Sequence, residues 1–156
     1  MKIRNYQATT DYEAVLALSE RLADFEQPIR ISKKELKRKQ REWLATDLNS
    51  SLQSPKSHLL VLANDEGTIH GFLELLEETD WLTDQKQGYL SRICLAKEAE
   101  GMGNGKKLML LAEEWAREQG YTGLTLMVMA ANNHAQSFYQ SLGYEVETMK
   151  MRKELM

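Results

Sequence analysis

The sequence predicts an α/β (α+β) protein in which a mixed sheet is flanked by helices. Two observations support this fold class. Segments with strand periodicity and segments with helical periodicity follow one another along the 156 residues. Two early strands are joined by a short turn, which makes them antiparallel, whereas a later strand, helix and strand form a unit that must cross over in parallel. The length fits one domain spanning 1–156.

Composition and charge narrow the function classes. Twenty Lys and Arg against 23 Asp and Glu give a net charge of -3, so no global basic field attracts nucleic acid or an anionic membrane. The single cysteine, Cys94, excludes an internal disulfide framework and fits a reducing compartment. The charged opening and the lack of a long apolar run predict neither a signal peptide nor a membrane span. We therefore expect a cytoplasmic protein.

The chain opens with an expected strand and helix. Residues 2–7 alternate polar and apolar side chains, the period of a half-buried strand. Thr10 and Glu13 have the spacing of a capping box at a helix start. The helix that follows would bury Val15, Leu18 and Leu22 on one face.

A second capping box, Ser32 with Glu35, predicts a second helix. Its buried side would carry Leu36, Trp43 and Leu44. Residues 30–42 hold seven basic side chains, which we interpret as a solvated helix face, with anion attraction as the alternative.

A hairpin and a further strand come next. Residues 58–63 and 68–77 are apolar runs separated by the turn sequence at 64–67. Residues 87–95 have the composition of another strand.

The last third alternates helices and strands. A helix after the glycine-rich segment 100–105 is expected to end at Gly120. Residues 123–130 follow as a strand, then a short helix capped by Asn132 or Asn133. That helix would stop at Gly143, and residues 144–153 would form a final strand.

The glycine-rich segment predicts a phosphate site, because a strand, a glycine turn and a helix start place free backbone N–H groups at the positive end of a helix dipole. A dinucleotide fingerprint begun at Gly101 fails, since Lys106 stands where its last glycine belongs. A Walker P-loop fails on spacing, and Lys107 replaces its Ser or Thr. A tight connection without a ligand remains the alternative.

Two motifs together resemble the GNAT superfamily of N-acetyltransferases. Residues 100–105, Glu-Gly-Met-Gly-Asn-Gly, match the family's acetyl-CoA signature at Gly103 and Gly105. Residues 132–144 are similar to its later motif, an Asn, an Ala three positions on, a Tyr four beyond, then Gly and an aromatic residue. The resemblance implies a mostly antiparallel GNAT-like sheet and acetyl-CoA as co-substrate.

The resemblance also implies roles for individual residues. The backbone around Leu95 would pair with the pantetheine arm, and Asn132 would hydrogen-bond that arm. Tyr139 would contact the cofactor and, as the catalytic acid, protonate the departing CoA thiolate. The strand residues implied are Ile93, Cys94 and Leu95, and the pyrophosphate would lie on the amides of Gly101, Met102, Gly103, Asn104, Gly105 and Lys106.

Two positions depart from the family pattern. Glu100 stands where the family prefers Gln or Arg, and its carboxylate would repel a pyrophosphate. The effect of Glu100 on the affinity for the cofactor stays open. Lys97 replaces a common proline.

The acceptor is expected to be a primary amine of a small molecule or peptide, which attacks the thioester directly. Residues 64–84 contain seven acidic side chains and no Lys or Arg, which favours a cationic amine. Glu74, Glu78 and Trp81 are the candidate substrate-binding residues, with solvated carboxylates or ordinary packing as the alternative reading. The general base stays open among Glu74, Glu77, Glu78, Tyr89, Ser91 and a water chain.

Other functions are less favoured. The histidines lack metal-ligand spacing, so no metal is expected, and Cys94 is expected to be a buried strand residue rather than a nucleophile. The alternative function is a GNAT-fold module that senses acyl-CoA and transfers little; overall acidity disfavours nucleic-acid binding. The oligomeric state is open, a homodimer included.

Overall fold

The computed structural model describes residues 1–25, 30–50 and 57–156. These form two compact units. Residues 1–24 and 30–127 make the first, and residues 128–156 with Phe25 belong to the second. The single domain expected over 1–156 stays a prediction.

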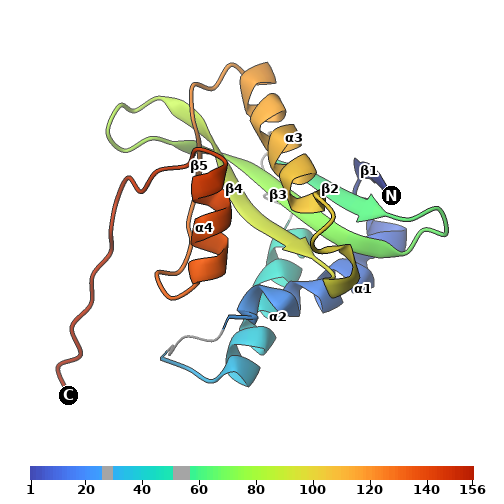
Figure 1. Ribbon diagram of the computed structural model, residues 1–156, viewed down its shortest axis with the longest axis horizontal. Coiled ribbons are helices and arrows are strands. Elements are labelled where there is room, and N and C mark those ends of the chain that lie inside the picture. The colour runs from blue at the N-terminus through green and yellow to red at the C-terminus, as the bar shows by residue number, and fades with distance from the viewer. Residues whose placement is uncertain (26–29, 51–56) are drawn as a thin grey trace. The chain divides into compact units, whose positions relative to one another are not determined.

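The first unit is built on a five-stranded sheet with the spatial order β1-β2-β3-β4-β5 (Figure 1). All neighbours are antiparallel except β4 and β5, which pair in parallel across the helical crossover. The predicted fold class is confirmed. The strands are β1 (Lys2–Asn5), β2 (His58–Ala63), β3 (Ile69–Thr79), β4 (Lys86–Leu95) and β5 (Leu124–Leu126).

Helices cover both faces of this sheet. One face packs against α1 and α2 through a core of buried apolar side chains, each worth about 1.5–3 kcal/mol of transfer free energy. The other face packs against α3. Gly88 of β4 lies so close to this helix that a Cβ added to it would be 3.1 Å from the ring of Trp115 in α3. The helices are α1 (Ala8–Ser19), α2 (Lys33–Asn49), α3 (Asn104–Glu118) and α4 (Asn133–Ser141), with short 3₁₀ turns η1 (Glu20–Ala23) and η2 (Lys97–Ala99). The first core contains Val15, Leu16, Leu44, Val61, Phe72 and Cys94.

The predicted capping box at Thr10 and Glu13 is wrong. The N-cap of α1 is Gln7, so Thr10 lies inside the first turn. The buried side chain here is Asp11, which accepts hydrogen bonds from the Gln7 backbone N–H at 2.8 Å and from Arg4 at 2.7 and 2.9 Å. A tertiary ion pair to β1 therefore sets the start of α1.

Helix α2 begins as predicted, because Ser32 accepts a hydrogen bond from the Glu35 N–H at 3.1 Å. Leu44 is fully buried, but Trp43 is not: 48% of its surface is exposed. Its ring lies under the Lys39 ammonium, 5.9 Å from the ring centroid, which gives the indole a partner at the surface.

The last predicted strand is wrong, and the strand before it is short. Only Leu124–Leu126 of residues 123–130 pair with β4, and residues 144–153 form no strand. Alternation makes a segment suitable for a sheet, but a strand exists only where a neighbour supplies ladder hydrogen bonds. Gly120 and Gly143 lie just past α3 and α4 with φ of 82° and 95°, as the helix ends require.

Candidate active site

The end of β4 has one open edge. Strand β4 pairs with β3 along its length but with β5 only from Gly88 to Leu90. Within the described sheet, Ile93, Cys94 and Leu95 therefore have ladder partners on the β3 side alone. The Leu95 carbonyl on this open edge accepts from Arg21 Nε at 2.9 Å. The other backbone groups along the edge suit an extended ligand arm that carries amides, which would add itself like a strand.

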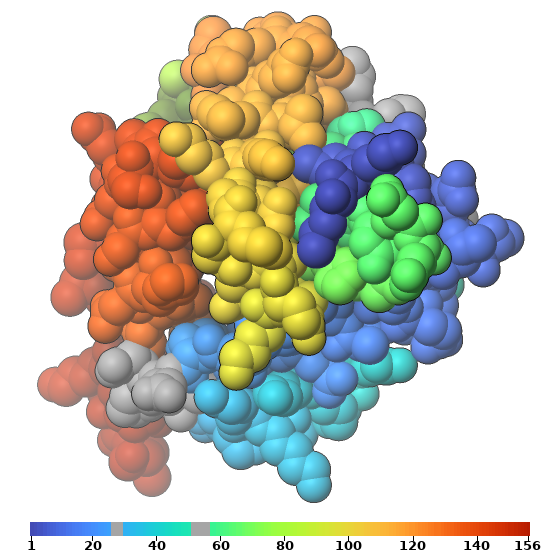
Figure 2. Space-filling view, turned by 45° about the vertical axis from the view of Figure 1, so that its right-hand side comes forward, coloured from blue at the N-terminus to red at the C-terminus, as the bar shows by residue number. Residues whose placement is uncertain are grey.

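The glycine turn after β4 is shaped for close approach of a ligand to the backbone. Gly101 and Gly103 have φ of 73° and 79°, a conformation that L-residues with side chains rarely adopt. A Cβ at either position would meet nothing within 4 Å, so both face open space. The segment after β4, yellow in Figure 2, lies at the molecular surface.

Helix α3 begins directly after this turn. The first intrahelical bond runs from the Lys107 N–H to the Gly103 carbonyl at 3.1 Å, so the amides just before Lys107 are left without an intrahelical partner. No side chain of the described residues caps this N-terminus. Asn104, which is buried, donates instead to the Ala99 carbonyl at 3.0 Å and braces the turn. Open amides and the dipole of a 15-residue helix meet here, which fits a pyrophosphate.

Arg21 in η1, which the sequence did not indicate as a site residue, reaches the same turn. Its Nη2 donates to the Glu100 carboxylate at 2.5 Å, and its Nε donates to the Leu95 carbonyl at 2.9 Å. Glu100, the residue that departs from the family motif, therefore has its charge compensated within the fold. No sequence signal joins residues 79 positions apart.

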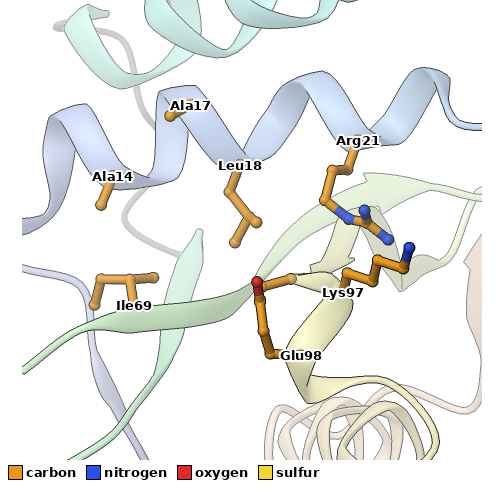
Figure 3. A pocket seen from close by; sticks show the side chains of 8 residues that line it. Ala14, Ala17, Leu18, Arg21, Ile69, Lys97 and Glu98 are labelled. Atoms are coloured by element: carbon orange, nitrogen blue, oxygen red, sulfur yellow. The ribbon is translucent and has the colours of Figure 1, made fainter.

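A pocket of about 360 Å³ lies between α1 and the segment after β4 (Figure 3). Its apolar wall comes from α1 and Ile69, and its charged side chains are Arg21, Lys97 and Glu98. Figure 3 shows the Arg21 side chain extending toward the segment that carries Lys97. The pocket therefore adjoins the glycine turn on the α1 side.

Cys94 points into the core, away from any role as a nucleophile. Its Sγ donates to the Leu18 carbonyl at 3.2 Å, and burial raises the pKa of the thiol to about 12. At neutral pH this thiol keeps its proton, and the nucleophile and metal ligand is the thiolate rather than the thiol. Any contact between Cys94 and a cofactor would involve its backbone.

The candidate acidic residues of β3 have different surroundings. Glu74 is buried and forms an ion pair with Arg92, which also binds Asp47 of α2 at 2.7 Å. Its carboxylate is thus engaged within the fold, which argues against direct contact with an amine. Glu77 accepts from the Tyr121 hydroxyl on the α3 side.

Glu78 lies on the face opposite Glu77, as strand parity predicts. Its carboxylate accepts hydrogen bonds from Gln87 at 2.8 Å and Thr125 at 2.6 Å. The neighbouring Tyr89 has its pKa raised, first by burial and then by the charge of Glu78. The charge of Glu78 therefore acts on Tyr89, and hydrogen bonds hold the Glu78 carboxylate to side chains of β4 and β5.

Trp81 lies at the opposite end of β4 from the glycine turn. It is 72% exposed in the turn between β3 and β4, whereas Leu95 pairs with Gly71 at the other end of the hairpin. Ten steps along β3 span about 33 Å. The structure does not bring Trp81 to the glycine turn.

The second unit holds the remaining candidate residues, Asn132 and Tyr139. Asn132 is the N-cap of α4, and its side-chain oxygen accepts from the Ala135 N–H at 3.3 Å. Tyr139 lies in α4 with ring contacts to Phe138 and Tyr144, at centroid distances of 5.4 and 6.1 Å. Burial raises the pKa of its hydroxyl to about 12, so the phenol is protonated at neutral pH.

Two features are absent from residues 1–25, 30–50 and 57–156. No three His, Cys, Asp or Glu side chains in these ranges gather as metal ligands would. No helix in the same ranges has both the length and the apolar composition needed to cross a bilayer.

The model of the acetyltransferase (GNAT) family matches residues 19–144. The chain belongs to the GNAT family. The resemblance drawn from the two motifs is thereby confirmed, and the match includes the glycine turn and α4.

Two curated relatives are named as N-acetyltransferases. The uncharacterized N-acetyltransferase YdgE of Bacillus subtilis is 34% identical over 94 residues, which cover 60% of this chain and 59% of the relative. N-acetyltransferase 8 of Rattus norvegicus is 28% identical over 99 residues, covering 64% of this chain and 45% of the relative. The matched region thus spans about half the length of these relatives.

Solved structures show the same GNAT fold. A putative acetyl transferase from Pyrococcus furiosus superposes with a TM-score of 0.77 at 23% identity, covering 99% of this chain and 100% of that one. An aminoglycoside 6'-N-acetyltransferase from Acinetobacter haemolyticus superposes with a TM-score of 0.66 at 16% identity and full coverage of both chains. At these identities the likeness concerns the fold.

Proposed function

We propose that this GNAT-family chain is an acetyl-CoA-dependent N-acetyltransferase, an acyltransferase that acts on a primary amine of a small molecule or peptide. One observation carries the proposal: the open edge of β4 runs into a glycine turn whose free amides stand at the N-terminus of α3. The pantetheine arm would lie along residues 93–95 and the pyrophosphate on residues 101–106. Family membership and the names of the curated relatives support acetyl transfer.

The transfer needs no charged catalytic group in the chain. The neutral amine nitrogen attacks the thioester carbonyl carbon, a backbone N–H near Leu95 stabilises the oxyanion, and the C–S bond then breaks. The Tyr139 hydroxyl protonates the leaving sulfur, and the proton lost by the amine passes through a base or water to the Tyr139 phenolate, which restores the phenol. Because the Asn132 oxygen caps α4, its amide NH₂ is the group that would donate to the pantetheine arm.

Thiol release from acetyl-CoA, measured against a panel of amines, tests this function. We expect thiol to appear only with certain amines, in equal amount to an N-acetylated product identified by mass. A cofactor at a hundredfold excess over its Kd should also raise the free energy of unfolding by about 2.7 kcal/mol. Thermal stabilisation by CoA together with no amine-dependent thiol release would support the alternative, a regulatory module that senses acyl-CoA.

Glu100 is the residue that favours this alternative, because its carboxylate would weaken cofactor binding. The ion pair with Arg21 compensates this charge, so the feature that favoured a non-catalytic module is weakened. The enzyme remains the function that the site supports best.

A further inference from the structure

We propose that Arg21 replaces, in space, the Arg or Gln that the GNAT signature has at position 100, and keeps the glycine turn able to bind an anionic cofactor. This inference rests on the proposed function and names a positioning residue for the cofactor site. It concerns a charge supplied from η1 rather than from the glycine motif itself.

The contacts of Arg21 fix its guanidinium at the turn. The Nε–H donates to the Leu95 carbonyl at 2.9 Å, which anchors the group at the end of β4 independently of Glu100. The Nη2 donates to Glu100 at 2.5 Å. With 29% of its side chain exposed, Arg21 is more enclosed than Glu100, which is 53% exposed. The arginine is therefore held in place while the carboxylate is drawn toward it.

The charges linked to Arg21 by ion pairs balance only when Arg21 is present. Asp24 lies 3.5 Å from Nη1 of Arg21 and 3.6 Å from the ammonium of Lys37. Lys37, Arg21, Asp24 and Glu100 thus form a chain of two cations and two anions with no net charge. Removing Arg21 leaves one uncompensated negative charge beside the amides that would receive a pyrophosphate.

An uncompensated carboxylate at this position would repel the cofactor directly. Like charges a few ångströms apart repel each other, and they do so more strongly near a protein surface than in bulk water. The expected loss of about tenfold in affinity corresponds to about 1.4 kcal/mol. Pairing to Arg21 cancels this repulsion, and it explains how a GNAT chain can carry Glu100 in its motif.

The test is a calorimetric titration of CoA into four variants at low salt. We expect Arg21→Gln to weaken CoA binding about tenfold relative to wild type. Removing the acid as well, in Arg21→Gln/Glu100→Gln, should restore binding to within about threefold of wild type, because the repelling charge is gone. Glu100→Gln alone should bind at least as tightly as wild type, and Arg21→Lys, which keeps the charge, should stay within about threefold.

A matched control is Arg41→Gln, which removes a surface arginine of α2 that contacts Glu13 at 3.4 Å. It should leave the affinity for CoA unchanged. Raising the salt concentration should reduce the defect of Arg21→Gln, since screening weakens the repulsion. A purely structural role of Arg21 would instead give a defect that Glu100→Gln does not rescue.

Three results would overturn the inference: unchanged binding in Arg21→Gln, a double variant as weak as Arg21→Gln, or Arg21→Lys as weak as Arg21→Gln. If Arg21→Gln does not fold, Glu100→Gln binding more weakly than wild type would contradict it. No CoA binding by the wild type would instead refute the proposed function, so the two failures are distinguishable.

Discussion

Burial of the Tyr139 hydroxyl has two opposite effects on its use as an acid. With its pKa raised to about 12, the phenol holds its proton at all physiological pH values. An ordinary thiol has a pKa of about 8.5, so full transfer from Tyr139 to a free thiolate is uphill by about 3.5 pKa units. Tyr139 would therefore act as a hydrogen-bond donor that delivers its proton as the C–S bond breaks.

We predict that Tyr139→Phe lowers kcat by about tenfold to a thousandfold and changes the affinity for acetyl-CoA little, since general acid catalysis contributes up to about 10⁴. Steady-state kinetics measure both values. Because the donor form persists until the pH approaches 12, Tyr139 should cause no loss of activity on the alkaline side below that pH.

Product release can mask this loss, so single-turnover rates are the control. An unchanged single-turnover rate in Tyr139→Phe would remove Tyr139 from the mechanism.

At the scale of single elements, β1 and α1 are joined by the ion pair between the half-buried Arg4 and the buried Asp11. Asp11 is 1% exposed, and its bonds to Arg4 lower the pKa of the carboxyl below its usual 3.8. A lowered pKa contributes stability above the unfolded value, and that contribution disappears as the pH falls through the folded value.

We predict that Asp11→Asn destabilises the protein by about 1–3 kcal/mol at neutral pH, because it leaves Arg4 and the start of α1 without their charged partner. Urea unfolding of both proteins across pH measures this difference. The difference should narrow as the pH falls from about 5 to below the pKa of Asp11. A difference that stays constant over that range would show that charge plays no part.

Elements were predictable where their signals are local. Ser32 and Asn132 cap helices, and Gly120 ends one, because each acts on residues within four positions of itself. Asp11 was missed as the residue that sets α1 because its partner lies in another element. The strand expected at 144–153 was wrong because alternation does not specify a pairing partner.

In the candidate site too, the parts with a local sequence signal were predictable and the part that depends on a tertiary contact was not. The glycine turn and the start of α3 follow from a contiguous motif, and the structure forms both. Arg21 could not be found from the sequence, since its contact with Glu100 exists only after α1 packs on the sheet.

At the scale of the whole molecule, the acidic residues that cluster in the sequence at 64–84 are spread apart in space. Asp65 and Glu66 lie in the turn before β3, whereas Asp80 and Asp84 lie in the turn after it, at the opposite end of this 11-residue strand. Glu74 is already paired with Arg92. The seven acidic residues of 64–84 therefore do not form one patch. Only the acidic residues after Glu74 in the sequence lie near the start of β4, at the end away from the glycine turn.

We predict that cationic amines still have the higher kcat/KM, but by a small factor that decreases with salt, because long-range attraction between exposed charges is screened. Matched cationic and anionic amines at two salt concentrations measure this. Equal values at low salt, or an advantage that salt does not reduce, would show that the acidic residues do not attract the substrate.

The central claim is that the glycine turn binds CoA, and calorimetric titration of two matched glycine variants tests it most directly. Gly103 and Gly120 both have positive φ and open space at the Cβ position, so Gly103→Ala and Gly120→Ala carry a similar backbone strain of about 1–2 kcal/mol. Only Gly103 stands at the N-terminus of α3. We predict that wild type and Gly120→Ala bind CoA equally and that Gly103→Ala binds at least about tenfold more weakly. Equal binding by both folded variants, or no binding by the wild type, would contradict the claim.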